Sequence, residues 1–160
     1  MMSPTIPTLF AYGTLREALL LEGVLGHPLD GLDIRPAIAP GFRTVFYPGR
    51  IYPALVEAEG AAAEGVAVAR LSAADLAVLD LFEGTEYERR AIVLDVEGRA
   101  VTGEFYRPLA AIGPDATAWS FAEWRRVHGE AMIVSEGETA ATLRHQLIAM
   151  GGEGEKPRSA

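Results

Sequence analysis

The stretch EGVAVARLSAADLAVLDLFEGTEYERRAIVLDV, Glu64–Val96, predicts one helix between two strands. Ser72 can cap a helix, and Asp75 stands at the third helical position, where a capping box needs an acceptor. Apolar residues then recur at helical spacing as far as Gly84, which fits a helix end. We therefore expect a helix over Ala73–Glu83, with a strand before it and a strand after it.

The downstream strand has a natural partner. RRAIVLDV, Arg89–Val96, and RAVTGEFYRPL, Arg99–Leu109, are separated only by Glu97 and Gly98. Two residues of this kind are typical of a tight hairpin turn, in which glycine adopts a positive φ. We expect these strands to be antiparallel neighbours.

Further elements are predicted on both sides. TLFAY, Thr8–Tyr12, is a short apolar strand, and the helix expected after it has Thr14 and Glu17 at capping-box spacing. Two strand pieces, FRTVFY and YPALV, lie on either side of the turn signal PGR. Towards the C-terminus the pattern is helical in WSFAEWRRVHGEAMIV and ETAATLRHQLIAM, and Ile148 is expected on an apolar face. Without regular alternation of strands and helices, the pattern favours an α+β domain on a small, mixed, partly closed sheet.

Composition limits the classes of function. A chain of 160 residues suits one domain, 1–150, and GGEGEKPRSA, 151–160, has the composition of a disordered tail. No apolar run approaches the roughly 18 residues of a membrane span, and the first ten residues lack a secretory pattern, so we expect a cytoplasmic protein. The excess of arginine over lysine, with abundant alanine, suggests a bacterial genome rich in G and C.

The net charge of the chain and its cysteine and histidine content limit the kinds of ligand and cofactor that we expect. A net charge of −8 opposes nucleic acid, so we expect a small-molecule ligand. The absence of cysteine excludes thiolate chemistry, and His27, His128 and His145 are scattered without metal-ligand spacing. We expect neither a metal nor another cofactor; the oligomeric state is left open.

Glu83 ends the predicted helix on its apolar side. It follows Leu76 by seven residues and Leu79 by four, so it should face the core or a cleft. Burial and the negative end of the helix dipole would both raise the pKa of its carboxyl, as suits a proton acceptor. Two alternatives are that the helix ends one residue earlier, or that Glu83 pairs with Arg89 or Arg90.

YGTLR, Tyr12–Arg16, is a second candidate site. A glycine between a strand and a helix start can leave backbone amides open to an anion. The segment lacks the residues of a Walker loop and the further glycines of a dinucleotide fingerprint. The alternative is an ordinary capped turn.

Taken together, four stretches of this chain resemble the gamma-glutamylcyclotransferase-like family in their order and spacing. They are FAYGTLR, GFRTVFYPGRIYPALV, the stretch Glu64–Val96 and GEFYRP. The resemblance covers Leu9 to about Pro108, and more loosely WSFAEWRRVHGEAM. It implies a small β-barrel-like α+β fold with a cavity. It also implies that Tyr12, Gly13, Thr14 and Leu15 bind a glutamyl group largely through their backbone, and that Glu83 is the catalytic acid/base. Phe82 stands where many members carry tyrosine.

The reaction implied is cyclisation of a γ-glutamyl amine or γ-glutamyl amino acid to 5-oxoproline, with release of the amine. Tyr52, Tyr87 and Tyr106 are candidate lining groups whose hydroxyls could bind substrate, although tyrosines in strands often only pack. The sequence leaves the leaving group undetermined. A non-catalytic small-molecule-binding protein, or a different amide-type reaction on the same fold, is the alternative.

Overall fold

Five strands close into a barrel in the computed structural model, which describes residues 6–159. Their order around the barrel is β1-β3-β2-β4-β5. Strand β1 is parallel to β5 and antiparallel to β3, and the other pairings are antiparallel, so the sheet is mixed. The strands are β1 (Leu9–Ala11), β2 (Asp33–Phe46), β3 (Pro53–Ala69), β4 (Tyr87–Val96) and β5 (Arg99–Pro108). The predicted α+β class is confirmed, and the sheet is fully closed.

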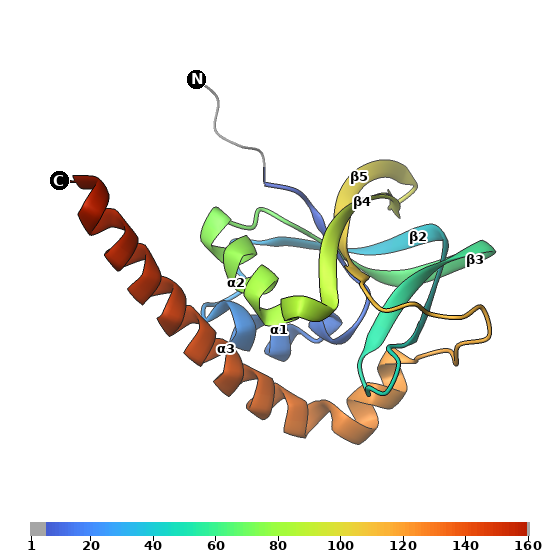
Figure 1. The fold of residues 1–160 in the computed structure, drawn as a ribbon. Helices are drawn as coiled ribbons and strands as arrows, with labels where there is room; N and C mark the ends of the chain where they lie inside the picture. Colours follow the sequence, from blue (N-terminus) through green and yellow to red (C-terminus); the bar gives the residue numbers. More distant parts are fainter. Residues whose placement is uncertain (1–5, 160) are drawn as a thin grey trace.

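The helices are inserted between strands or appended after them. They are α1 (Ala18–Leu25), α2 (Ala73–Glu83) and α3 (Phe121–Ser159), with short 3-10 turns η1 (Thr14–Arg16) and η2 (Gly84–Glu86). Figure 1 shows α3, in orange and red, running past α1 and α2 on the side of the molecule away from the tip of the β4–β5 hairpin. The barrel therefore carries its helices together on one side.

The predicted hairpin between β4 and β5 is confirmed. Val96 pairs with Arg99, and the two turn residues have positive φ, 53° at Glu97 and 82° at Gly98. Such values suit the turn types whose twist matches that of the strands.

The hairpin of β2 and β3 is longer than predicted. Its register shifts between Pro40 and Phe42, which marks a bulge. Prolines within β2 had suggested shorter strand pieces. Since β2 pairs with β4 only at Ile38, most of that edge needs no N–H donor, and Pro36 and Pro40 are tolerated there.

Helix α2 has the predicted bounds and the predicted capping box. The Asp75 amide donates to Ser72 Oγ at 3.0 Å, and the Ser72 amide donates to Asp75 Oδ2 at 3.0 Å. The second expected capping box is wrong. Thr14 lies in η1 and caps nothing, because α1 begins only at Ala18, while Glu17 accepts a hydrogen bond from Arg125 of α3 at 2.7 Å.

The C-terminal helical region is one continuous helix. Ile148, expected on an apolar face, is 75% exposed because α3 extends beyond the body it packs on. The predicted tail falls on the last turns of α3 and on residue 160, which lies outside the described residues, so its disorder and the domain boundary stay predictions. No helix within residues 6–159 is long and apolar enough to cross a membrane.

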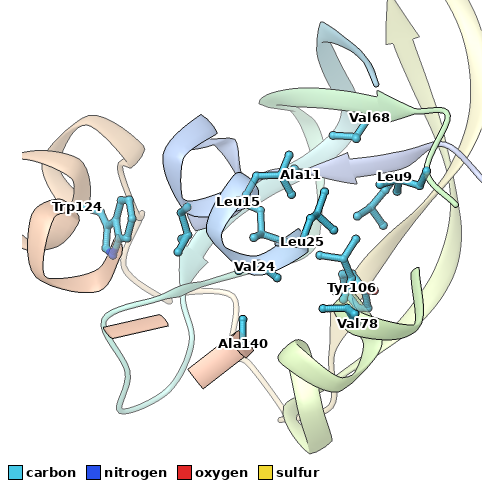
Figure 2. Close-up of a cluster of buried hydrophobic side chains, with 14 of the residues drawn as sticks. Leu9, Ala11, Leu15, Val24, Leu25, Val68, Val78, Tyr106, Trp124 and Ala140 are labelled. Carbon is cyan, nitrogen blue, oxygen red and sulfur yellow. The ribbon is translucent and has the colours of Figure 1, made fainter. Parts of the chain in front are cut away.

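The helices and the barrel share one apolar cluster. Figure 2 shows side chains of β1, α1, α2 and α3 converging, with Ala140 of α3 near Val24 of α1. Leu79 of α2 and Leu20 of α1 are fully buried in this cluster. The cluster fixes the end of α2 relative to the turn after β1.

Ser72→Ala should lower the free energy of unfolding by about 1 kcal/mol, because it removes the acceptor that caps α2. Thermal unfolding followed by circular dichroism should show a Tm lower by about 2–4 °C. The matched control is Ser135→Ala, at an exposed position within α3, which should leave Tm unchanged or slightly raised. Equal Tm values for the two variants would contradict a stabilising cap.

Candidate functional site

A cavity of about 260 Å³ opens between the turn after β1, the end of α2 and the inner face of α3. Its walls are mostly apolar or aromatic, with a few carboxylates. All eight site residues predicted from the sequence line it: Glu83 together with Tyr12, Gly13, Thr14, Leu15, Tyr52, Tyr87 and Tyr106. Segments far apart in the sequence thus meet at one site.

Glu83 is the last residue of α2, and its partly buried side chain faces the cavity. Burial raises the pKa of its carboxyl to about 8, and the like charges of Glu136, Glu86 and Asp80 add to the rise. Within residues 6–159, the Glu83 carboxyl has neither an ion pair nor a hydrogen bond. At neutral pH it is therefore mostly protonated and close to its midpoint.

Neither structural alternative for Glu83 holds. The helix does not end early, and the neighbouring arginines are engaged elsewhere. Arg89 donates to Asp80 at 2.8 Å and also pairs with Glu104 of β5. Arg90 pairs with Glu88 at 2.9 Å. These contacts hold both guanidinium groups away from the Glu83 carboxyl.

The turn Gly13–Arg16 presents unused backbone donors beside the cavity. The Arg16 amide donates to the Gly13 carbonyl at 3.0 Å, which closes η1. The backbone amides of Gly13, Thr14 and Leu15 come before the first hydrogen bond of this turn. Within the described part of the chain, none of the three donates a hydrogen bond. Such N–H groups can bind a carboxylate or a developing oxyanion.

Gly13 is required by close packing. A Cβ built on Gly13 would lie 2.6 Å from Cγ of Pro53, a distance that side chains do not tolerate. Pro53 is itself buried at the start of β3 and lines the cavity. The glycine therefore lets β1 and its turn approach β3.

The tyrosine hydroxyls are already committed as donors. Tyr12 donates to the Tyr106 carbonyl at 2.7 Å, Tyr87 to the Pro53 carbonyl at 2.6 Å, and Tyr106 to Asp80 at 2.8 Å. Tyr52 donates to Glu86. Burial raises the pKa values of Tyr87 and Tyr106, so both stay protonated. These rings shape the cavity, and their hydroxyls reach a ligand only as acceptors.

Sequence reasoning missed three polar contributors. Glu86 lies in η2, lines the cavity and has Arg50 at 3.3 Å. Trp124 and Glu136 of α3 complete the wall. Trp124 is also buried. Nothing local in the sequence connects Glu136 with Glu83, which lies on another helix.

No group of three or more His, Cys, Asp or Glu side chains in residues 6–159 is arranged to hold a metal ion.

Comparison with known proteins places the chain in a family. The sequence model of the family described as "Gamma-glutamyl cyclotransferase, AIG2-like" matches residues 9–126. This match covers all five strands of the barrel, both candidate motifs and the start of α3. The chain belongs to this family.

Two similar family members come from Arabidopsis thaliana. AIG2-like protein B is 29% identical over 134 residues, which cover 82% of this chain and 76% of the relative. AIG2-like protein D is 28% identical over 144 residues, which cover 87% of this chain and 92% of the relative. The similarity extends across about three quarters of the first relative and most of the second.

Solved structures agree on the fold. A solution structure of an Arabidopsis thaliana protein, 25% identical, has a TM-score of 0.65 and covers 87% of this chain and 84% of its own. A structure titled "Gamma-glutamyl cyclotransferase", 17% identical, has a TM-score of 0.55 and covers 64% of this chain and 66% of its own. The family and the fold expected from the sequence are both confirmed.

Gly13→Ala should destabilise the fold by about 1–3 kcal/mol, because the new methyl group overlaps Pro53. Adding Pro53→Ala removes the ring that the methyl group meets and should restore part of the loss. Chemical denaturation of the single and double variants measures the coupling. A Gly13→Ala protein as stable as the wild type would contradict the packing role.

Glu83→Gln should change how stability depends on pH. A folded-state pKa of about 8 lies above the ordinary value of 4.5, so the folded protein keeps a proton that the unfolded chain releases. Wild-type stability should therefore decrease as pH rises from about 4.5 to 8, by on the order of 1–3 kcal/mol, and Glu83→Gln should lack this decrease.

Denaturation at pH 5 and pH 8.5 tests this expectation. Glu57→Gln, at an exposed position of β3, is the control and should retain the wild-type pH dependence. Parallel stability profiles for wild type and Glu83→Gln would mean that Glu83 titrates normally.

Proposed function

We propose that this protein is a cyclotransferase that converts a γ-glutamyl amine or γ-glutamyl amino acid to 5-oxoproline and releases the amine. The observation that carries the proposal is Glu83, an unpaired carboxyl of raised pKa that faces a cavity beside three unused amides. Family membership supports the same chemistry. The partner proposed is thus a small molecule, with no nucleic acid, membrane or cofactor, in the cytoplasm.

The substrate supplies its own nucleophile in this reaction. The α-amino nitrogen attacks the γ-carbonyl carbon, a five-membered ring closes, and the bond to the leaving nitrogen breaks. Well-oriented intramolecular attack reaches effective molarities of about 10⁵ M or more. The protein therefore mainly has to fold the substrate and move protons from the attacking nitrogen to the leaving nitrogen.

We assign this proton transfer to Glu83. Its carboxylate accepts a proton from the α-ammonium group, which frees the nitrogen to attack. The protonated carboxyl then gives this proton to the leaving nitrogen, and the restored carboxylate takes the second proton, which the attacking nitrogen must lose to become the lactam N–H. Passing that second proton to the released amine or to solvent returns Glu83 to its starting state. A carboxyl with a pKa of about 8 is a stronger base than an ordinary glutamate and can still donate its proton near neutral pH, which suits both transfers.

The amides of Gly13, Thr14 and Leu15 are assigned to the anionic parts of the substrate. They can hold its α-carboxylate or the oxyanion that forms as the nitrogen attacks. Tyr12 and Tyr106 hold this turn against β5 through the hydrogen bond between them. Tyr52 and Tyr87 are proposed to shape the opposite wall.

Glu83→Gln should lower kcat/KM for 5-oxoproline release by about 10²–10⁴-fold, because an amide cannot carry the proton. Release from γ-glutamyl-alanine and γ-glutamyl-butylamine can be followed by chromatography. Glu57→Gln, at an exposed position of β3 outside the cavity, is the matched control and should keep wild-type activity. Wild-type rates in Glu83→Gln would reject the assignment, and binding without turnover in the wild type would favour a binding protein.

The rate of the wild-type enzyme should rise with pH through about 8. Turnover requires loss of one proton from the pair formed by Glu83 and the α-ammonium group, so the ionised fraction of Glu83 limits activity at lower pH. A profile of kcat/KM from pH 6 to 9.5 measures the midpoint. A flat profile, or one that falls over this range, would contradict the role of Glu83 as base.

A further inference from the structure

The turn Gly13–Arg16 is too short to hold its own conformation. The 3-10 turn within it, η1, spans three residues and has no side-chain cap. Two backbone hydrogen bonds close it, from the Arg16 amide to the Gly13 carbonyl at 3.0 Å and from the amide that follows to the Thr14 carbonyl at 3.1 Å. So few bonds do not offset the ordering of the chain. Contacts with other elements must therefore fix the direction in which its free amides point.

The first turn of α3 contacts the two residues that come directly after these amides. The Arg125 guanidinium donates to a carboxylate oxygen of Glu17 at 2.7 Å and forms an ion pair with it. The guanidinium carbon of Arg16 lies 4.6 Å from the ring centre of Phe121, the first residue of α3. Two successive residues at the end of the turn are thus attached to one turn of α3.

The ion pair between Arg125 and Glu17 lies partly out of water. The Glu17 side chain is 16% exposed, and the Arg125 side chain is 37% exposed. Among the described residues, Arg125 is the one cation that pairs with Glu17. Loss of the guanidinium would leave a mostly buried carboxylate without a partner, which is more costly than loss of a fully exposed pair. The carboxylate would then move toward water and take the end of the turn with it.

Gly129 of α3 makes room for this guanidinium. A Cβ built on Gly129 would lie 2.6 Å from Nη1 and 2.8 Å from Cδ of Arg125. Glycine inside a helix is less stable than alanine, so its presence there usually has a packing reason. A Cβ built on Gly137 of the same helix meets no neighbour within 4 Å. The Arg125 side chain therefore lies over Gly129, in the position from which it reaches Glu17.

We infer that Arg125 is a positioning residue, which through Glu17 holds the turn Gly13–Arg16 so that its free amides face the bound substrate. This inference rests on the proposed cyclotransferase function. Arg125 is not among the described residues that line the cavity, so it acts on the substrate only through the turn. A turn that is already ordered spares the ordering that binding would otherwise require, and its loss should weaken binding by about tenfold.

Hydrogen exchange measures the turn directly in Arg125→Met, which keeps an unbranched side chain and removes the charge. The amides of Arg16 and Glu17 should exchange about tenfold faster than in the wild type, because the turn opens more easily. Arg126→Met is the matched control, since Arg126 is exposed and pairs with Glu123 within α3, and it should keep the wild-type rates. Wild-type exchange in Arg125→Met would overturn the inference.

Release of 5-oxoproline from γ-glutamyl-alanine measures the effect on the reaction. Arg125→Met should lower kcat/KM by about tenfold. The midpoint of its pH profile should stay unchanged, because Glu83 lies on α2. Arg125→Lys keeps a positive charge and should recover part of the loss, and Arg126→Met should keep the wild-type kcat/KM. A lower Tm in Arg125→Met with unchanged kcat/KM would mean that Arg125 only stabilises the fold, and would overturn the inference.

Gly129→Ala displaces the guanidinium without removing it. This variant should lower kcat/KM by about fivefold, whereas Gly137→Ala, the matched control, should leave kcat/KM unchanged. Alanine favours a helix more than glycine does in both variants, so helix propensity does not account for a difference between them. Equal kcat/KM in the two variants would overturn the inference.

The outcomes separate this inference from the proposed function. A wild-type protein that releases no 5-oxoproline would reject the proposed function, and the positioning role with it. A wild-type protein that releases 5-oxoproline, together with an equally active Arg125→Met variant, would reject the positioning role alone.

Discussion

A carboxyl group without a counter-ion, at the end of α2, is the feature on which the rest of the site depends. Removing Glu83 from water disfavours its charged form, and no cation in the described chain compensates for the loss. The surrounding ion pairs maintain this condition. Asp80 and Glu104 hold Arg89, and Glu88 holds Arg90. Since these cations are held outside the cavity, the pKa of Glu83 stays high and its proton stays available.

The barrel brings hydrogen-bond donors to the other side of the same cavity. Closure of the sheet through β1 places the turn Gly13–Leu15 near the end of α2, although about 70 residues separate them. Close packing of Gly13 on Pro53 and the hydrogen bond from Tyr12 to Tyr106 fix the turn. The Glu83 carboxyl and a set of amide donors thus face each other across a cavity of about 260 Å³.

The local parts of this arrangement could be predicted from the sequence, because helix periodicity, capping and turn residues act over a few positions. The bounds of α2, its cap at Ser72 and the cavity side of Glu83 follow from these rules. Contributions that depend on long-range packing could not be predicted. Glu136 comes from a helix far along the chain, and the hydroxyl of Tyr87 donates a hydrogen bond to the carbonyl of Pro53, which is also distant in the sequence. The capping box predicted at Thr14 is wrong because Thr14 lies in a 3-10 turn, and α1 begins only after that turn, at Ala18.

The central claim is that Glu83 titrates near pH 8 within the folded protein. Its carboxyl carbon can be followed by NMR in protein labelled with ¹³C at the glutamate side chains, with Glu83→Gln used to assign the signal. The account predicts a midpoint near the value of about 8 given by its burial. A midpoint close to the ordinary glutamate value of 4.5 would contradict it.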